Sequence, residues 1–356
     1  MRIVLLMTQS LQSPGAVGRF MPLARELHNL GHRVTVLGLY HDRTGWDRRP
    51  VTVDGVTVQY VGSMHVRKVG NRKSYYGPLL LLWILAQATL GAIVALWRIP
   101  CDVIQVCKPH PQNSLAAWCV GKLRRIPVFV DCDDYEAVNN RFAGKWQQRS
   151  VAWFEDWAIR SAQGVTAGNT FLRDRALALG VAPERVVLMH NGVDRARFSV
   201  LAAADAAERV AELQRRHYGL SSHRVLFLGT VSLVSHGLDI LLHAWVQVAR
   251  SVPDARLLVV GAGEDFDHIV AMASELGLGE SVEFAGKVAG ELVPFYYRTA
   301  AITVDPMHSS VPAESSLSLK LVESIAAGVP CVTANIGDRA AVAGDAGLAV
   351  APDDAQ

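Results

Sequence analysis

Short apolar runs alternate with amphipathic segments along the whole chain. The first half carries the runs RIVLLMT, RVTVLGL, VTVQYV, CDVIQV, IPVFVDCD and GVTAGN, and helical periodicity fills several of the intervals between them. Runs of β-branched residues bounded by turn residues are typical of strands, and strands that alternate with helices are typical of βαβ units in a parallel sheet. The pattern therefore predicts an α/β fold.

The alternation is interrupted by a polar, alanine-rich stretch and then begins again. The second half carries RVLFLGT, ARLLVVG, VEFAG, AAITVDP and PCVTAN, again separated by helical segments. We expect two doubly wound, Rossmann-like domains that face a central cleft: an N-terminal domain over residues 1–198, a linker region over 199–222 and a C-terminal domain over 223–356. Because ligands of such sheets bind beyond the carboxyl ends of the strands, the site is expected in that cleft.

Residues 78–97 break the alternation, because they form a long stretch without any charge. As a helix the stretch would be about 30 Å long, which is enough to cross a bilayer. It follows a basic approach that contains Arg67, Lys68, Arg72 and Lys73. Three interpretations are open: a buried core helix, a helix on the sheet whose outer side touches a membrane surface through residues 67–97, and a full span. A full span would put two parts of one sheet on opposite sides of a membrane.

Composition narrows the class of protein. The chain has 356 residues, 50% of them hydrophobic and 19% charged, which excludes disorder as the main state, and a net charge of +2 with a pI near 8.3 is too mild to indicate nucleic-acid binding. The five cysteines have no spacing suited to zinc, and the N-terminus fits a first strand better than a signal peptide. We expect a cytoplasmic protein with buried thiols at Cys101, Cys107, Cys119, Cys132 and Cys331.

One predicted helix combines an apolar surface with a lysine and a glutamate. Ser316 and Ser318 are good N-cap residues and Gly328 suits the C-terminal end, so Lys320 and Glu323 fall on one narrow polar stripe. The stripe is either a solvated face with an i,i+3 ion pair, or part of a buried helix that faces a ligand. In the second case the free N–H groups of the helix would bind an anion, with Lys320 beside it.

An acidic loop follows the run IPVFVDCD. Its carboxylates form either a solvated loop or a group that accepts a proton or binds a sugar hydroxyl, in which case Asp134 is slightly favoured over Asp133 because it lies farther past the strand. A divalent cation would lack a second cluster of ligands. The acidic residues are Asp131, Asp133, Asp134 and Glu136.

Two glycines lead from the first strand into a helix. Gly15 and Gly18 suit either a phosphate-binding loop or an ordinary turn, and they lack the spacing of dinucleotide-binding folds. This disfavours a nicotinamide-dependent oxidoreductase.

Several motifs occur together in order: GAVGRFMPLARELHNLGHRVTV, CDVIQV, HNGVDRARF, VLFLGT, HGLDILLHAW, LLVVGAGE, VEFAGKV and KLVESIAAGVPCV. The ordered set resembles the GT-B glycosyltransferases of family four, also called glycosyl transferases group 1. The resemblance implies retaining transfer of a sugar from a nucleotide-sugar donor, with no cofactor and no required metal. It implies an acceptor held mainly by the N-terminal domain, which we expect to be lipid-linked or a cell-envelope glycan, at the inner face of the cell membrane.

The resemblance also implies roles for single residues. Glu323 matches the glutamate that takes the donor ribose, Lys287 and Val288 match the loop whose backbone meets the base, and Gly15 matches a glycine near the diphosphate or acceptor. Asn191 and Asp194 match an interdomain motif that we interpret as structural. The candidate catalytic residues are Asp133, Asp134 and Lys320, and the candidate binding residues are Gly15, Gly18, Thr230, His236, Lys287, Val288, Glu314, Ser316, Leu319 and Glu323.

The chain departs from the family pattern at three places. Thr230 and His236 stand where many members have an arginine and a lysine, and Ser315 stands where many have a glutamate, with Glu314 one position earlier. Lys320 would replace the missing positive charge at the diphosphate. These departures keep a second hypothesis open, a degenerate partner subunit that binds a sugar nucleotide, and the shared fold keeps open a third, a nucleotide-sugar epimerase. Relatives usually continue beyond the last residues given, so we also expect truncation.

Overall fold

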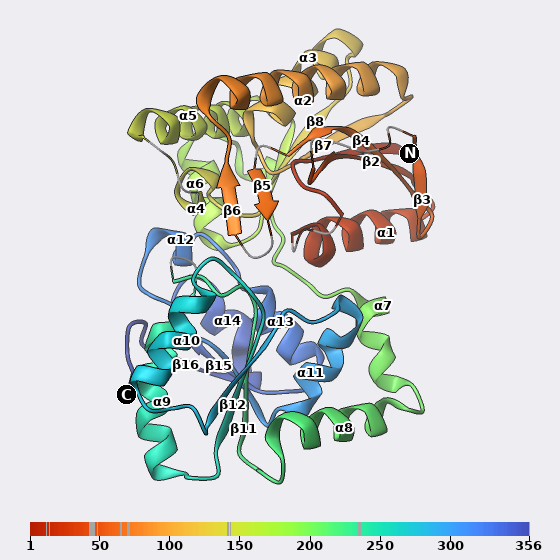
Figure 1. Ribbon diagram of the computed structural model, residues 1–356. Coiled ribbons are helices and arrows are strands. Elements are labelled where there is room, and N and C mark those ends of the chain that lie inside the picture. Colours follow the sequence, from red (N-terminus) through yellow and green to blue (C-terminus); the bar gives the residue numbers. More distant parts are fainter. Residues whose placement is uncertain are drawn as a thin grey trace. The chain divides into compact units, whose positions relative to one another are not determined.

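The computed structural model describes residues 1–11, 13, 15–42, 47, 49–64, 66–69, 72–140, 142, 144–233 and 236–355, and for 66–69 and 72–75 it describes the backbone alone. It divides into two compact units, Met1–His190 and Asn191–Gln356. Each unit contains one predominantly parallel sheet with helices packed on it (Figure 1). The predicted α/β fold with two Rossmann-like domains is confirmed.

The first unit is built on an eight-stranded sheet in the order β10-β9-β8-β7-β1-β2-β4-β3. All neighbouring strands are parallel except β3 and β4, and β5 and β6 form a separate hairpin. The predicted apolar runs became the strands β1, β2, β4, β7, β8 and β9, whereas the short β3 and β10 and the hairpin were not predicted. The bounds are β1 Arg2–Met7, β2 Arg33–Tyr40, β3 Val51–Val53, β4 Val56–Ser63, β5 Val66–Val69, β6 Arg72–Tyr75, β7 Val103–Cys107, β8 Val128–Cys132, β9 Gly164–Ala167 and β10 Val186–Leu188.

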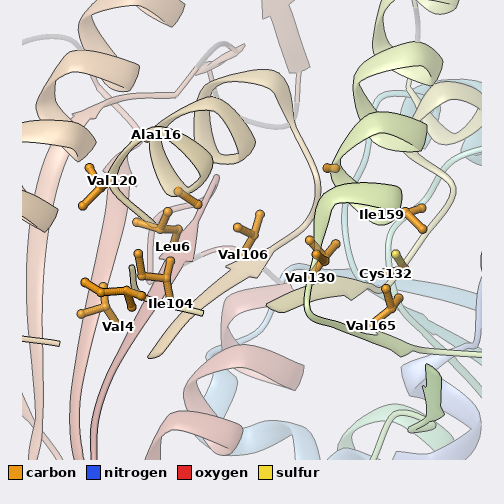
Figure 2. Packing of buried hydrophobic residues seen from close by; sticks show 14 of the residues in the cluster. Val4, Leu6, Ile104, Val106, Ala116, Val120, Val130, Cys132, Ile159 and Val165 are labelled. Atoms are coloured by element: carbon orange, nitrogen blue, oxygen red, sulfur yellow. The ribbon is translucent and has the colours of Figure 1, made fainter. Parts of the chain in front are cut away.

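Helices cover both faces of this sheet. On one face the apolar sides of α2, α3 and α5 pack on strands β1, β7 and β8, as Figure 2 shows for Val4, Ala116 and Ile159. On the other face α1 covers a separate cluster that contains Leu5 and Val36. The helices are η1 Ala16–Phe20, α1 Met21–Asn29, α2 Pro78–Arg98, α3 Pro111–Arg124, α4 Glu136–Asn139, α5 Lys145–Ser161, α6 Thr170–Ala178 and the short turn η2 Pro183–Arg185.

The uncharged segment forms α2, which is buried on one side only. Its inner side packs through small residues and Leu96, but 28% of its most apolar window is buried, and Leu79, Leu82 and Trp83 are exposed. A wholly buried core helix is therefore wrong. By length and composition, with a mean hydropathy of 2.3, α2 is able to cross a membrane. However, β4 and β7 on either side of it in sequence belong to one sheet, which a full span would separate.

The second unit contains a six-stranded, all-parallel sheet in the order β13-β12-β11-β14-β15-β16. Its first five strands in sequence follow the five predicted runs, and β16 was not predicted. The strands are β11 Arg224–Leu228, β12 Arg256–Val260, β13 Val282–Gly286, β14 Ile302–Asp305, β15 Cys331–Ala334 and β16 Gly347–Val350. The helices are α7 Arg195–Phe198, η3 Ser199–Ala202, α8 Ala206–Tyr218, α9 Leu238–Ser251, α10 Phe266–Glu275, η4 Gly290–Leu292, α11 Val293–Thr299, α12 Val311–Glu314, α13 Leu319–Ala326, α14 Arg339–Ala343 and η5 Gly344–Ala346.

The unit boundary lies at His190 and Asn191, earlier than the expected boundary after residue 198. Phe198 is buried in the core of the second unit, and Arg197 is ion-paired with Glu323 of that unit. Most of residues 199–222, expected to be a linker, belongs to η3 and to α8, which packs on α11 through Tyr218. The polar composition that suggested a linker reflects the exposed side of α8.

We predict that Gly91→Ala destabilises the first unit by about 1–3 kcal/mol, because a Cβ at Gly91 would lie 2.0 Å from the carbonyl oxygen of Val61 on β4. The matched control is Gly77→Ala at the N-terminus of α2, where a Cβ meets nothing within 4 Å, and its cost is expected to stay below about 1 kcal/mol. Urea unfolding followed by circular dichroism measures both. Equal stabilities of the two variants would contradict the close packing of α2 on β4.

Candidate functional site

The carboxyl end of β8 in the first unit carries a fully buried aspartate, Asp131. The guanidinium of Arg19 donates two hydrogen bonds to its carboxylate, at 2.9 Å from Nε and 2.8 Å from Nη2, and the hydroxyl of Thr166 donates a third. Arg19 belongs to η1, which follows the first strand. The paired geometry offsets part of the cost of burying both charges and fixes η1 against the carboxyl end of the sheet.

A second ionic group lies beside this pair and centres on Lys108, the residue after β7. Its ammonium lies 2.7 Å from carboxylate oxygens of both Asp134 and Glu136, and 3.5 Å from Asp133. His110 contacts the other oxygen of Glu136 at 2.9 Å. Lys108 has a φ of +71°, a left-handed conformation that is uncommon for a residue with a side chain. The backbone after β7 therefore places the ammonium of Lys108 among three acidic side chains.

The charges of this group influence one another. Burial raises the pKa of Asp133 to about 6, although Lys108 opposes the shift, and Asp134 adds to it. Burial also disfavours the charge of Glu136, but Lys108 and His110 together hold its pKa below the usual range. For Lys108 the neighbouring carboxylates outweigh burial and raise its pKa. Asp133 is therefore a carboxyl group that exchanges its proton near neutral pH.

The acidic loop is thus not a solvated loop. The side chain of Asp133 is 11% exposed and that of Asp134 is 30% exposed, and both contact Lys108. The slight preference for Asp134 over Asp133 stays a prediction, and the shifted pKa supplies an argument for Asp133.

Gly15 and Gly18 lie at the start of η1 and within it. Gly15 has a φ of −65°, so its backbone does not require glycine, and a Cβ there would meet the flexible side chain of Gln9.

The carboxyl end of the sheet in the second unit is also organised by a fully buried aspartate, Asp305, the last residue of β14. It accepts hydrogen bonds from Ser318 at 3.0 Å, from Thr333 at 3.2 Å and from Arg339 at 3.3 Å, and the ammonium of Lys320 lies 3.1 Å from it. These cations, with Lys320 ahead of Arg339, overcome the effect of burial and hold the pKa of Asp305 below its usual range. One carboxylate therefore links β14, β15, α13 and α14.

Lys320 is buried at the start of α13. Its ammonium also lies 3.0 Å from Nδ1 of His236 and 5.4 Å from the ring centre of Phe227. Burial first, and then the charge of Lys320, hold the pKa of His236 well below its ordinary value, so the imidazole is neutral and accepts the hydrogen bond. Ser318 is the N-cap residue of α13, but its hydroxyl turns to Asp305 and makes no capping bond. The first N–H groups of α13 are therefore not satisfied by their N-cap side chain.

Glu323 lies one turn further along α13 and is also buried. Its carboxylate binds Arg197 at 2.5 Å and accepts a hydrogen bond from Tyr297 at 3.1 Å. Lys320 and Glu323 are each 8% exposed and each binds partners from other elements. The interpretation of a solvated stripe with an i,i+3 ion pair is therefore wrong.

The other predicted binding residues lie in loops at the carboxyl ends of the strands or at helix ends. Thr230 and Lys287 are exposed after β11 and β13, and Val288 packs on the core of the second unit. Glu314 ends α12 and is exposed, whereas the neighbouring Ser315 is fully buried. Ser316 donates to the carbonyl of Ala313 at 3.4 Å, and Leu319 is the first residue of α13.

The loops after β11 and β12 touch through their backbones. Gly261 has a φ of +141°, and a Cβ there would lie 1.8 Å from the carbonyl oxygen of Gly229. The glycines of the motif LLVVGAGE therefore serve this close packing beside Lys320, whose side chain covers Gly229.

Several residues of the two clusters were not predicted from the sequence. In the first unit they are Arg19, Lys108 and His110, and in the second they are Arg197, Asp305 and Arg339. Lys108 and Asp305 each lie at the end of a predicted strand, which was a usable signal. The arginines carried no such signal. Within the described ranges no group of three or more His, Cys, Asp or Glu side chains is arranged to hold a metal ion.

Comparison with known proteins gives two family models and related chains. A model described as "Glycosyl transferase 4-like domain" matches residues 15–192, and one described as "Glycosyl transferases group 1" matches residues 222–356. D-inositol 3-phosphate glycosyltransferase 1 of Catenulispora acidiphila is 28% identical over 298 residues, which cover 80% of this chain and 66% of that enzyme. A GDP-mannose-dependent α-(1-6)-phosphatidylinositol monomannoside mannosyltransferase of Mycolicibacterium smegmatis is 30% identical over 148 residues, 41% of this chain and 37% of that enzyme.

The matched stretch thus spans about two thirds or less of these two relatives. Among solved structures, Anabaena HepE in complex with UDP and glucose is similar with a TM-score of 0.70 at 17% identity, over 99% of this chain and 86% of that one, which is a likeness of fold. The two parallel sheets, the ordered motifs and the two matching models together show that the chain belongs to the glycosyl transferases group 1, the family-four glycosyltransferases with the GT-B fold.

Proposed function

We propose that the protein is a retaining glycosyltransferase that moves a sugar from a nucleotide-sugar donor to an acceptor. The observation that carries the proposal is the arrangement around α13, where a buried lysine, a buried glutamate and a helix N-terminus without a side-chain cap lie at the carboxyl end of a parallel sheet. Such an end is where α/β sheets bind their ligands, and a helix N-terminus favours an anion. Family membership supports the same reaction.

In this proposal α13 binds the donor. The N–H groups at its start and the ammonium of Lys320 would take the diphosphate, which gains negative charge as the sugar departs. A carboxylate accepts about four hydrogen bonds, so Glu323 keeps acceptor sites for two ribose hydroxyls beside its bonds to Arg197 and Tyr297. Those two partners fix the orientation of the carboxylate. Because Lys320 supplies positive charge, no metal is required in this mechanism.

The first unit would hold the acceptor. Asp133, with a pKa of about 6, is suited to accept a proton from an acceptor hydroxyl, and the cations of Lys108 and Arg19 hold it in place. The relatives are named for inositol 3-phosphate and for a phosphatidylinositol mannoside, which supports a lipid-linked or cell-envelope acceptor. The exposed apolar side of α2 supports peripheral contact with the inner face of the cell membrane. The side chains of Arg67, Lys68, Arg72 and Lys73 lie outside the described part.

A second candidate, a subunit that binds a sugar nucleotide without turnover, has two observations in its favour. His236 stands where many family members carry a lysine, and it is neutral beside Lys320. Ser315 stands where many family members have a glutamate, and it is fully buried and carries no charge.

One experiment separates these functions. Purified protein is incubated with a panel of nucleotide sugars and a lipid extract of the cell envelope, and the product is examined by proton NMR. A new glycoside with the anomeric configuration of the donor is expected. A product of opposite configuration would exclude retention, a new nucleotide sugar formed without acceptor would indicate an epimerase, and donor binding without any product would indicate the partner subunit.

Asp133→Asn is predicted to flatten the dependence of stability on pH. Because the folded-state pKa is raised above the unfolded value, the folded state binds the proton more tightly, and the free energy of unfolding falls as pH rises from about 4 through 6. Removing this titration should raise stability above pH 6 by roughly 1–3 kcal/mol relative to the parent. Urea unfolding at pH 4, 5, 6 and 7 measures it. Asp134→Asn should move this dependence to lower pH without abolishing it, because it removes one cause of the raised pKa and leaves Asp133 to titrate, and an unchanged slope for Asp133→Asn would contradict the assignment.

The same pair of variants tests the role in transfer. If Asp133 accepts the proton, Asp133→Asn lowers the single-turnover rate by about 10²-fold or more, and the parent rate rises with pH through about 6. Unchanged kinetics for both Asp133→Asn and Asp134→Asn would remove this loop from the mechanism.

Lys320→Ala and Glu323→Ala are predicted to impair different steps, turnover in the first case and donor binding in the second. Lys320 would act mainly on charge that develops in the transition state, so its loss should lower turnover more than donor affinity. Glu323 would act on bound donor, so its loss should weaken both donor and free nucleoside diphosphate by about 1.5–3 kcal/mol. Glu323→Gln keeps an acceptor for Tyr297 and checks that folding is not the cause.

Calorimetric titration with nucleoside diphosphate and single-turnover transfer rates measure both variants. Glu275→Ala, which changes an exposed glutamate at the end of α10, is the control and should match the parent. Parent-like binding and turnover in both Lys320→Ala and Glu323→Ala would rule out α13 as the donor site.

A further inference from the structure

One face of the first unit concentrates exposed tryptophans. In the described part of the chain, each tryptophan that is exposed lies on α2, α3 or α5: Trp83, Trp97, Trp118, Trp146 and Trp153. These three helices pack side by side on one face of the sheet (Figure 1). Isolated exposed apolar residues are ordinary, but a contiguous surface rich in tryptophan marks a binding surface. Tryptophan in particular is enriched where a protein meets the membrane–water interface.

A groove of about 430 Å³ opens between α3 and α5 on this face. Its accessible apolar lining comes from Trp118 and Trp157 and from Pro127 and Val128 after α3, whereas Val106 and Val130 beneath it are buried in the core. Gly121 is so close to β8 that a Cβ would lie 2.5 Å from the side chain of Val128. Binding sites for small molecules occupy about 300–1,000 Å³ and are mostly apolar, so the groove has the size and lining for one flexible apolar chain.

Two tryptophans form one side of the groove. Trp118 of α3 and Trp157 of α5 meet edge to face, with ring centres 5.7 Å apart. Trp157 shares its helix face with Trp146 and Trp153, because spacings of seven and four residues return to the same side of a helix. The exposed tryptophan surface therefore continues into the groove.

The charges around the groove are positive. Lys122 and Arg125 line it and are exposed, and the ammonium of Lys122 lies 5.0 Å from the ring centre of Trp118. Neither α2 nor α3 contains an acidic residue. On α5 Glu155 is fully buried and Asp156 is ion-paired with Arg175. An anion at the mouth of the groove would thus meet two cations with no exposed, unpaired carboxylate on these helices.

We propose that this groove takes one acyl chain of an anionic phospholipid drawn from a membrane surface. The chain lies along the apolar lining between α3 and α5, Trp118 and Trp157 contact it, and the phosphate binds Lys122 and Arg125. The exposed tryptophans of α2, α3 and α5 then lie at the membrane–water interface. A second copy of the chain is a poor occupant, because a symmetric contact would bring the same basic residues together. The inference deepens the membrane contact proposed for α2 and rests on it.

The test begins with co-sedimentation of the full chain with vesicles. Vesicles that contain phosphatidylglycerol should bind the protein, and vesicles of phosphatidylcholine alone should bind it at least about tenfold more weakly. The double variant Lys122→Gln, Arg125→Gln should lose about fivefold in affinity for each charge removed. Equal binding to both kinds of vesicle, or no effect of the double variant, would overturn the assignment of the phosphate site.

Filling the groove tests the chain site itself. Ser161 is exposed, lines the groove and ends α5, so Ser161→Phe should block the chain, and Ser251→Phe changes an equally exposed serine that ends α9. The probe is dihexanoyl phosphatidylglycerol below its micelle concentration, titrated by calorimetry. We expect at least about a fivefold loss of affinity for Ser161→Phe and none for Ser251→Phe. Equal affinities of these two variants would overturn the groove as the site.

A third variant distinguishes the groove from the apolar side of α2. Leu79→Gln with Trp83→Gln changes two exposed residues of α2 that do not line the groove. It should weaken binding to vesicles but not to the short-chain lipid. Unchanged vesicle binding would refute the membrane contact of α2 without refuting the acyl-chain site in the groove. If the parent forms dimers and ignores both lipids, a second copy covers this face and the proposal is wrong.

Discussion

Two fully buried aspartates at the carboxyl ends of parallel strands determine how the two candidate clusters, one in each unit, are assembled. Asp131 in the first unit and Asp305 in the second are both removed from water, and an uncompensated buried carboxylate costs several kcal/mol. Each is therefore surrounded by donors from other elements: Arg19 and Thr166 in one case, and Lys320, Arg339 and hydroxyl groups in the other. Satisfying the carboxylate thereby fixes the loops and helices that follow neighbouring strands.

This constraint explains why the candidate catalytic and binding side chains, both cations and acids, gather at the carboxyl ends of these two sheets. Near Asp131, Lys108 holds Asp133 and Glu136, and burial, with the charge of Asp134, raises the pKa of Asp133 to about 6. Near Asp305, Lys320 is held at the start of α13, and the hydroxyl of Ser318 is diverted from its capping role. The same interaction that stabilises the second unit therefore leaves N–H groups of a helix available to an anion.

The alternation of apolar runs predicted most strands of both sheets but not β3, β10 or β16, since strands of a parallel sheet are buried on both faces and stand out as apolar runs. Lys320, Glu323 and the acidic loop were identifiable because they interrupt such patterns. Their partners were not, because Arg19 and Arg197 are distant in sequence and only the folded chain brings them close. Mean hydropathy also does not show which side of α2 is buried. The linker predicted at 199–222 is largely helix α8, whose exposed side gives that stretch its polar composition.

We propose that the second unit binds a nucleotide sugar at α13. Thermal unfolding of the protein in the presence of UDP-, GDP- and ADP-sugars tests it most directly, because a ligand that binds only the folded state raises the melting temperature in proportion to its occupancy. We expect a rise with one nucleotide class that grows with concentration and persists with the corresponding nucleoside diphosphate but not with the free sugar. No rise with any nucleotide or nucleotide sugar at millimolar concentration would contradict it.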